Sequence, residues 1–412
     1  MRHPRAALAA AWLATRALMV WLLTLRGWDA VGREVWQLYH HWYGVLAHGA
    51  YPVRDTLWRY PPGAGPLLLS PGLLPGLTYF QAFVALTLAA DAATALALAR
   101  AGTRPGRGLL GAGVWIGGLP LLLHLPLARY DVQVTALAVL ALLVSTRSTR
   151  ACGALVALAA LVKVWPVLLL TGLPKGRATR SAWTAATVTG TTVLALLVTL
   201  FDHPFAFLRP QGGRGVQIES FGGTLLALAR HAGWPGKVRY RYGALEYTGP
   251  YVSTVAHASL ALTVVALALV LLWRARARHW GEATPYDAAL SAVLLCTVTS
   301  RVISPQYLIW LLGLAAVCLT SRHTTQRPVA ALVLAATAVT TLVYPVLYDE
   351  VAAATWTGCA LMVVRNGLLG AAAVLSFTRV WRSTAGVPPP RVSAGSPAVT
   401  AVVPAGPGRL VH

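Results

Sequence analysis

Apolar stretches of about 18 or more residues recur from one end of this 412-residue chain to the other. A helix of that length crosses the hydrocarbon core of a bilayer, and so much apolar surface cannot be covered by polar groups in water. Hydrophobic residues make up 57% of the chain and charged residues 11%, whereas a soluble domain carries roughly a quarter charged residues. The sequence therefore predicts an all-α fold, a polytopic bundle of membrane-spanning helices.

The hydropathy pattern predicts ten spans. They lie at about 7–26, 79–100, 107–124, 129–146, 181–201, 252–273, 285–300, 302–320, 328–346 and 352–378. The first is too long, and its end too bulky, for a cleaved signal peptide. Short loops that carry Arg or Lys are expected in the cytoplasm. Ten spans place all such loops, and both termini, on that side of the cell membrane.

The segment 151–173 does not fit this count, because it is long enough for one crossing yet basic at both ends. The sequence Lys163-Val-Trp-Pro166 interrupts its middle, and proline removes a helical hydrogen bond. We predict two half-helices that form a re-entrant hairpin, whose irregular backbone has to line a cavity or be buried in protein. The membrane domain is predicted at 1–380, and the Pro/Gly/Ala-rich residues 383–412 are predicted to form a disordered cytoplasmic tail.

The net charge of +22 raises the question of nucleic-acid binding. No soluble basic domain is present to hold a duplex, so we expect cationic loops and no nucleic-acid partner. The four cysteines fall inside apolar stretches without metal-ligand spacing, and they are predicted to be buried small hydrophobic residues. The sequence predicts no metal site and no cofactor.

Acidic residues are rare in this chain, so the position of each one is informative. Asp91 lies well inside a predicted span, as do the cations Arg16 and Arg365, which are candidates to pair with it or with backbone carbonyls. Nine of the 12 acidic residues fall on or near the predicted extracytoplasmic side: Asp29, Glu34, Asp55, Asp131, Asp202, Glu219, Glu246, Asp349 and Glu350. This gathering predicts a polar cavity at that face.

Short polar motifs next to apolar sequence supply the candidate substrate-binding residues. Arginine recognises phosphate in a bidentate way, although pairing with local carboxylates and lipid headgroups is the plainer explanation for any single arginine. Pro305 is expected to start a helix with Ser304 at its N-cap and Gln306 in its first turn, which makes an anion site beside Arg301. The candidates are Tyr39, Tyr60, Arg129, Asp131, Lys163, Arg214, Gln217, Glu219, Arg301 and Gln306.

Six segments, in this order and spacing, resemble actinobacterial membrane glycosyltransferases of family 87, which belong to the C superfamily of such enzymes. They are WRYPPGAG, ARYDVQVTALAVLALL, LVKVWPVLLL, RGVQIES, SRVISPQYLIWLL and LVYPVLYDE, and the resemblance covers about residues 10–380. The family includes polyprenol-phosphate-mannose-dependent α-1,2-mannosyltransferases. The resemblance implies a sugar, mannose or arabinose, carried on polyprenyl phosphate. It is transferred outside the cytoplasm to a glycolipid or a cell-envelope glycan, among membrane lipids.

The resemblance also implies inversion at the anomeric carbon, with a carboxylate of the first outer loop as general base. Cations such as Arg214, Arg301 or Lys163 would hold the charge of the leaving phosphate. In relatives an Asp stands four residues before the tyrosine that matches Tyr39, and here that position is Val35. The candidate bases are then Glu34, Asp55 and Asp29, with Asp29 ranked third.

Two further readings stay open. One is a transporter or flippase of a lipid-linked sugar, and the other is a non-catalytic relative, which the missing Asp favours. Transporters tend to have repeated halves and paired broken helices near the midplane, and no second interruption matches the one at Lys163–Pro166. Charge gathered at one face favours the enzyme.

Overall fold

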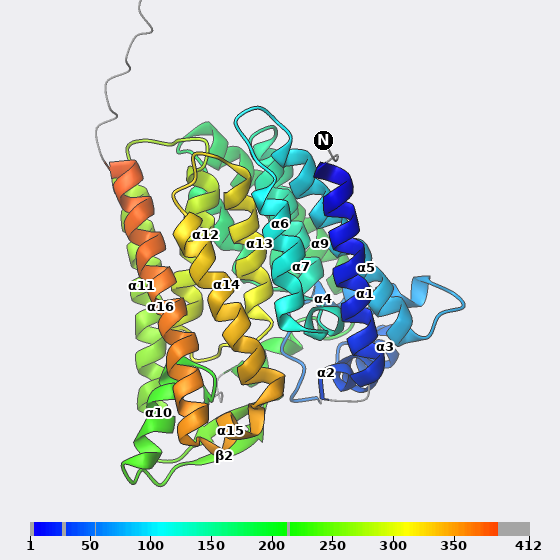
Figure 1. The fold of residues 1–412 in the computed structure, drawn as a ribbon. Coiled ribbons are helices and arrows are strands. Elements are labelled where there is room, and N and C mark those ends of the chain that lie inside the picture. The colour runs from blue at the N-terminus through cyan, green and yellow to red at the C-terminus, as the bar shows by residue number, and fades with distance from the viewer. Residues whose placement is uncertain (1–3, 27–29, 54, 212–214, 386–412) are drawn as a thin grey trace, which may run out of the picture.

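The computed structural model describes residues 4–26, 30–53, 55–211 and 215–385. Long helices run side by side through the molecule, and α1 begins at the same end of the bundle where α16 ends (Figure 1). Within the described residues, six helices are long and apolar enough to cross a membrane. They are α1 (Pro4–Arg26), α5 (Tyr79–Gly102), α9 (Arg177–Leu200), α11 (Val252–Arg276), α14 (Arg327–Thr341) together with the π-helix η7 (Leu342–Val346) that continues it, and α16 (Trp356–Ala385).

Four shorter helices occupy the remaining predicted spans. They are α6 (Leu110–Gly118), α7 (Asp131–Val144), α12 (Thr284–Thr299) and α13 (Tyr307–Thr320). Each of the ten predicted ranges therefore holds a helix, and the all-α membrane bundle is supported. The crossing of a membrane by the four shorter helices stays a prediction.

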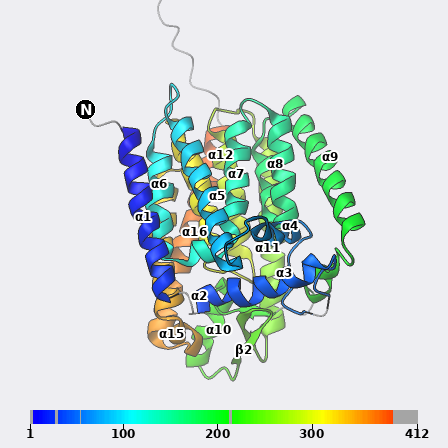
Figure 2. The same ribbon diagram turned by 90° about the vertical axis from the view of Figure 1, so that its right-hand side faces the viewer.

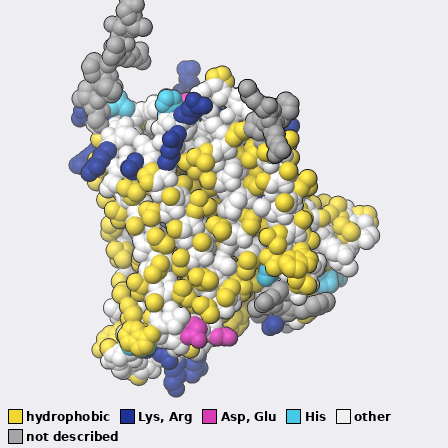
Figure 3. Space-filling view, viewed as in Figure 1, with side chains coloured by type: hydrophobic (Ala, Val, Ile, Leu, Met, Phe, Trp, Pro, Cys, Tyr) yellow, Lys and Arg dark blue, Asp and Glu magenta, His cyan; other side chains and the backbone are white. Residues whose placement is uncertain are grey.

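Burial separates the inner helices from the outer ones. Every residue of α13 from Leu308 to Thr320 is buried, whereas the apolar window of α9 is only 6% buried. Figure 3 shows charged side chains gathered towards the two ends of the molecule, with an apolar band between them. An apolar surface of this extent suits contact with lipid tails rather than with water.

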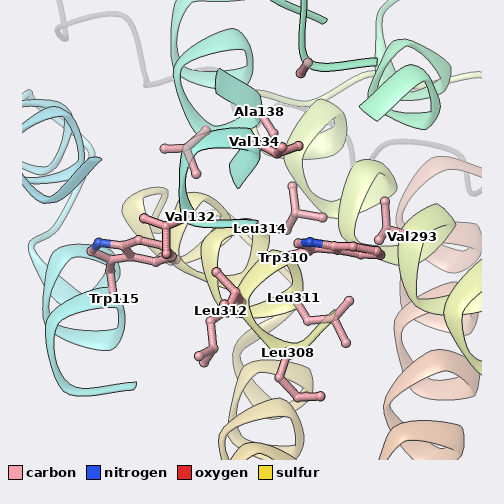
Figure 4. Packing of buried hydrophobic residues seen from close by; sticks show 14 of the residues in the cluster. Trp115, Val132, Val134, Ala138, Val293, Leu308, Trp310, Leu311, Leu312 and Leu314 are labelled. Atoms are coloured by element: carbon pink, nitrogen blue, oxygen red, sulfur yellow. The ribbon is translucent and has the colours of Figure 1, made fainter. Parts of the chain in front are cut away.

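Close backbone contacts hold the inner helices together. A Cβ added at Gly111 of α6 would lie 2.1 Å from the Ala316 carbonyl oxygen of α13. Small residues at such positions let helix backbones approach, as is common in membrane bundles. Trp115 of α6 and Trp310 of α13 are the two large side chains of the buried cluster drawn in Figure 4.

The interrupted segment consists of two packed pieces. Helix α8 (Thr149–Val162) ends at Lys163, whose backbone is extended, and the 3-10 helix η5 (Trp165–Gly172) follows with Pro166 in its first turn. The predicted break is thus present, and η5 packs against α8 and α12. The re-entrant placement of this hairpin in a bilayer stays a prediction.

Two long loops, one between α1 and α5 and the other between α9 and α11, form a layer across one end of the bundle. In the first loop, α2 and α3 lie across the long helices (Figure 2). The elements of this loop are α2 (Ala30–Arg33), the π-helix η1 (Glu34–Tyr39), α3 (His40–Ala47), α4 (Ala64–Leu69) and η2 (Ser70–Leu73). Residues 30–47 of this loop thus form a continuous run of three short helical pieces.

The second loop contains a small antiparallel sheet that the all-α prediction missed. Its strands are β1 (Val216–Gln217), β2 (Lys237–Arg241) and β3 (Ala244–Thr248), in the order β1-β3-β2. Helix α10 (Phe221–His231) follows β1, with the Ser220 hydroxyl accepting from the Gly223 amide at its N-cap. The remaining short helices are η3 (Leu119–Leu122), η4 (Leu125–Ala128), η6 (Ala206–Gln211), η7 (Leu342–Val346) and α15 (Tyr348–Ala353).

Candidate functional site

A cavity of about 1100 Å³ lies between this layer and the ends of the inner helices. Its inner wall is formed where α8 gives way to η5, where α12 ends and where α13 begins. Its outer wall comes from η1, from the β2–β3 hairpin and from the η7–α15 segment. Helices α8, α12 and α13 thus each have one end at this cavity.

Lys163, at the break after α8, is the cation of the inner wall. Its ammonium group donates to Asp131 Oδ1 at 2.6 Å, and the Trp310 indole donates to the same oxygen at 2.6 Å. The ammonium group also lies 4.7 Å from the ring centre of Tyr130 and 5.1 Å from that of Trp310. Carboxylate and aromatic rings together fix a charged group at a depth where an unpaired charge is costly.

Glu34, at the start of η1, is the carboxylate of the outer wall. It lines the cavity with 24% of its side chain exposed. Arg129 Nη2 lies 2.7 Å from Glu34 Oε2, and the Tyr39 hydroxyl donates to Glu34 Oε1 at 3.0 Å. Burial raises the pKa of Tyr39 well above its usual value, so this phenol keeps its proton and acts as a donor. Two side chains thus orient the Glu34 carboxylate.

The other two candidate bases have different positions. Asp55 is not among the residues that line the cavity. The Trp42 indole donates to Asp55 Oδ2 at 2.7 Å, and the Leu57 amide donates to Oδ1 at 2.8 Å, so this carboxylate holds the loop together. Asp29 lies outside the described residues, as does Arg214.

The segment around β1 brings two distant motifs together. The backbone amide of Gln217 donates to the Arg301 carbonyl at 3.1 Å, and its side-chain amide lies 3.5 Å from Ser304 Oγ. Gln217 and Glu219 both line the cavity, as does Gln306. The Arg301 side chain is half-buried beside this wall and is not among the lining residues.

The helix cap predicted at Ser304 is wrong. Helix α13 begins at Tyr307, so Gln306 occupies the N-cap position and its side chain makes no cap hydrogen bond. The Ser304 carbonyl instead accepts from the Tyr307 amide at 2.9 Å, in a tight turn that delays the helix. Pro305 starts this turn rather than the helix itself, and Ser304 is left facing the cavity.

Glu219 is the most deeply buried carboxylate of the cavity wall, with 2% exposed. Burial raises its pKa to about 7, and the positive charge of Arg365 opposes this rise. Arg365 Nη2 lies 3.6 Å from Glu219 Oε2. A carboxyl group that titrates near neutral pH in a cleft is a mark of a functional site.

Several aromatic residues of the wall were not predicted as site residues. Tyr240 comes from β2, Tyr344 from η7, Tyr348 from α15 and Trp310 from α13. The predicted Tyr60 joins them, and burial raises the pKa of its phenol. Two signals were available: Tyr344 and Tyr348 belong to the LVYPVLYDE segment, and residues 237–248 alternate like a hairpin.

The wall thus combines apolar side chains, the Lys163 cation and aromatic rings with two carboxylates. Arg129 orients the first, Glu34, and the second, Glu219, is buried. Aromatic rings and polar side chains of this kind can bind a sugar ring, and Lys163 can bind an anionic group. Within the described residues no group of three or more His, Cys, Asp or Glu side chains has a metal-binding arrangement.

Among the comparisons with known proteins, the one with protein-family models agrees with this chemistry. The chain has no match among curated proteins or solved structures. The family model for glycosyltransferase family 87 matches residues 58–305, which is more than half of the 412 residues. This range includes most of the cavity wall. The chain belongs to glycosyltransferase family 87 and is a membrane glycosyltransferase.

Proposed function

We propose that this protein transfers mannose from a polyprenyl-phosphate donor to a glycolipid or glycan of the cell envelope. The reaction takes place at the outer face of the cell membrane, with both termini in the cytoplasm. One observation carries the proposal: a single cavity holds the Lys163 cation, an apolar wall and the Glu34 carboxylate. The cation and the apolar wall suit the phosphate and the lipid chain of the donor. The carboxylate can accept the proton of an attacking hydroxyl group.

The donor fits the inner wall. Its phosphate is placed at the Lys163 ammonium group, which lies at the boundary between polar and apolar lining. The isoprenoid chain follows the apolar lining of Leu168, Val293 and Cys296. Val164 lines the cavity and is 63% exposed, so this path reaches the outside of the bundle.

Glu34 acts as the general base in this proposal. The acceptor hydroxyl oxygen forms a bond to the anomeric carbon while the bond from that carbon to the phosphate oxygen breaks. The hydroxyl proton passes to the Glu34 carboxylate, and the electron pair of the broken bond leaves with the phosphate. Lys163 holds the negative charge that develops on this leaving group. Glu34 thereby takes the role that the resemblance gives to the missing aspartate.

The test is transfer by the full-length protein in nanodiscs. Radiolabelled polyprenyl-phosphate-mannose is the donor, and an extracted envelope glycolipid pool is the acceptor. Glu34→Gln is expected to lower the rate about 10²- to 10⁴-fold, the usual contribution of a positioned base. Glu282→Gln is the matched control, because Glu282 pairs with Arg107 outside this cavity.

The other outcomes each overturn a part of the proposal. Full activity of Glu34→Gln together with loss in Asp55→Asn would make Asp55 the base. Donor binding by the wild type without transfer would favour a flippase or a non-catalytic relative. Transfer of arabinose in preference to mannose would correct the sugar and leave the reaction class in place.

A further inference from the structure

Two buried acceptor atoms of cavity-lining residues have no hydrogen-bond partner among the described residues, and one of them lies 3.6 Å from the Arg365 guanidinium. They are Gln217 Oε1 and Glu219 Oε2, on side chains that are 3% and 2% exposed. Native proteins leave few buried polar atoms unpaired, because the lost solvation is costly. A ligand that donates two hydrogen bonds would satisfy both atoms.

The end of β1 and the turn that follows it carry these two side chains. Gln217 is the last residue of β1, and the Ser220 amide donates to the Gln217 carbonyl at 3.0 Å, which closes the turn that contains Glu219. The intervening Ile218 is buried in the hydrophobic cluster behind β1. The Ile218 amide donates to the Leu245 carbonyl at 3.1 Å, which ties the segment to β3. The pair is therefore held by the sheet before any ligand arrives.

Helix α16 supports the same segment from behind. Arg365 Nη1 donates to the Glu219 carbonyl at 2.8 Å, and Asn366 Nδ2 donates to the same oxygen at 3.3 Å. Asn366 also donates to Thr224 Oγ1 at 2.8 Å. The Arg365 side chain is fully buried, so its positive charge stays close to Glu219 and water does not replace it. The backbone of Glu219 is thus fixed by two side chains of α16, and its carboxylate starts from a preorganised position.

Aromatic rings complete the surroundings. Tyr344 and Tyr348 line the cavity, and their ring centres lie 5.0 Å apart in an edge-to-face arrangement. Burial and, after it, the negative charge of Glu219 raise the pKa of Tyr348, which places this phenol near the carboxylate. An amide, a carboxylate and aromatic faces together suit a pyranose ring, whose hydroxyl groups donate hydrogen bonds and whose C–H faces are apolar.

We propose that Gln217 and Glu219 form a subsite that binds neighbouring hydroxyl groups of a sugar ring. The inference rests on the proposed function, because it assigns a sugar to the same cavity. The ring belongs either to the donor sugar or to the terminal sugar of the acceptor. Both present the same chemistry, and the kinetic arm of the experiment separates them.

The first arm measures binding without catalysis. The full-length protein in nanodiscs is titrated with octyl α-D-mannopyranoside, and saturation-transfer NMR reports the bound sugar. Glu219→Gln keeps the shape of the side chain and removes its charge, and we expect affinity to fall about 10- to 100-fold. Gln217→Met is expected to weaken binding as well, and Glu282→Gln should bind like the wild type. Equal affinity of the wild type and both subsite variants would overturn the subsite.

The second arm measures transfer kinetics. A rise of KM for the donor alone assigns the subsite to the donor sugar, and a rise for the acceptor alone assigns it to the acceptor sugar. Loss of kcat in Glu219→Gln with both KM values unchanged would make Glu219 a base and overturn the binding role. Scanning fluorimetry checks that each variant is folded. If Glu219→Gln is not folded, Gln217→Met alone tests the subsite.

Failure of the proposed function looks different. A wild type that binds the mannoside through Glu219 but transfers nothing leaves the subsite in place and removes the reaction. A wild type that transfers mannose while both subsite variants keep normal affinity and KM removes the subsite and leaves the reaction.

Discussion

At the residue scale, charges inside the bundle are paired as the sequence predicts. Arg16 donates two hydrogen bonds to the Asp91 carboxylate, each of 2.7 Å, and a third to the Ile116 carbonyl. The indoles of Trp12 and Trp115 donate to the same carboxylate. The pairing was predictable because an ionised group at membrane depth needs a partner, and Asp91 was the sole acidic residue deep inside a predicted span. The two tryptophans could not be inferred, since their contacts depend on packing between helices.

The Lys163 site shows the limit of such reasoning. Lys163 and Asp131 were both predicted to bind substrate. Asp131 accepts hydrogen bonds from Lys163 and from Trp310, which lies 179 residues further along the chain, and Lys163 also lines the cavity. Sequence reasoning identified chemically capable residues near one face. It could not tell which of them would orient another site residue, as Asp131 orients Lys163, or stabilise a loop, as Asp55 does.

The raised pKa of Glu219 predicts a pH dependence of sugar binding. Below about pH 7 the carboxylate gains a proton and becomes a weaker acceptor, so the affinity for octyl α-D-mannopyranoside should fall as the pH is lowered from 8 to 6. Arg365 on α16 lies 3.6 Å from the Glu219 carboxylate. Burial raises the pKa of Tyr348 on α15, so this phenol stays neutral over the range, and Glu246 on the neighbouring β3 accepts from the Gly215 amide. The measurement is the binding titration at several pH values. The same inflection in Glu219→Gln would assign it to another group.

At the scale of elements, the ten helical ranges were predictable because apolar length is a strong signal. The β1-β3-β2 sheet of the second loop was not predicted. Its hairpin has Tyr242 and Gly243 with positive φ of 50° and 70°, between two alternating strands. A residue pair ending in glycine at such a place is a hairpin signal. This hairpin signal was not used, because the apolar spans of the rest of the chain indicated an all-α fold.

The contact between α8 and α9 predicts a sharp effect of one methyl group. A Cβ at Gly153 would lie 2.0 Å from the Ala182 carbonyl oxygen, whereas a Cβ at Gly190 would lie 3.8 Å from the Ala157 Cβ. Gly153→Ala should therefore push α8 away from α9 at a cost of about 1–3 kcal/mol and displace Lys163 at its end. We expect a lower thermal midpoint and weaker transfer, with Gly190→Ala as the tolerated control. Equal midpoints of the two variants would show that α8 can shift without cost.

At the scale of the whole molecule, the proposed sidedness makes a direct prediction. Arg239 lies exposed on β2 and Arg147 lies exposed after α7, towards opposite ends of the bundle. In a Cys296→Ala background, a cysteine at position 239 should react with an impermeant maleimide in intact cells, and a cysteine at position 147 should react only after lysis. The remaining cysteines are buried and give little background. The reverse pattern would place the cavity on the cytoplasmic side and overturn the proposed location of the reaction.

The shortness of the inner helices has an electrical consequence. Helices α7 and α13 have 14 residues each, or roughly 21 Å at 1.5 Å per residue, against about 30 Å for the hydrocarbon core. A cavity that admits water at the start of α13 leaves a thinner insulating layer, and the membrane potential falls mainly across that layer. In the proposed reaction, the donor phosphate at Lys163 lies part of the way into this field. With the cavity on the proposed outer side, the negative cell interior pushes a released phosphate group outward, so an energised membrane would help it to leave Lys163.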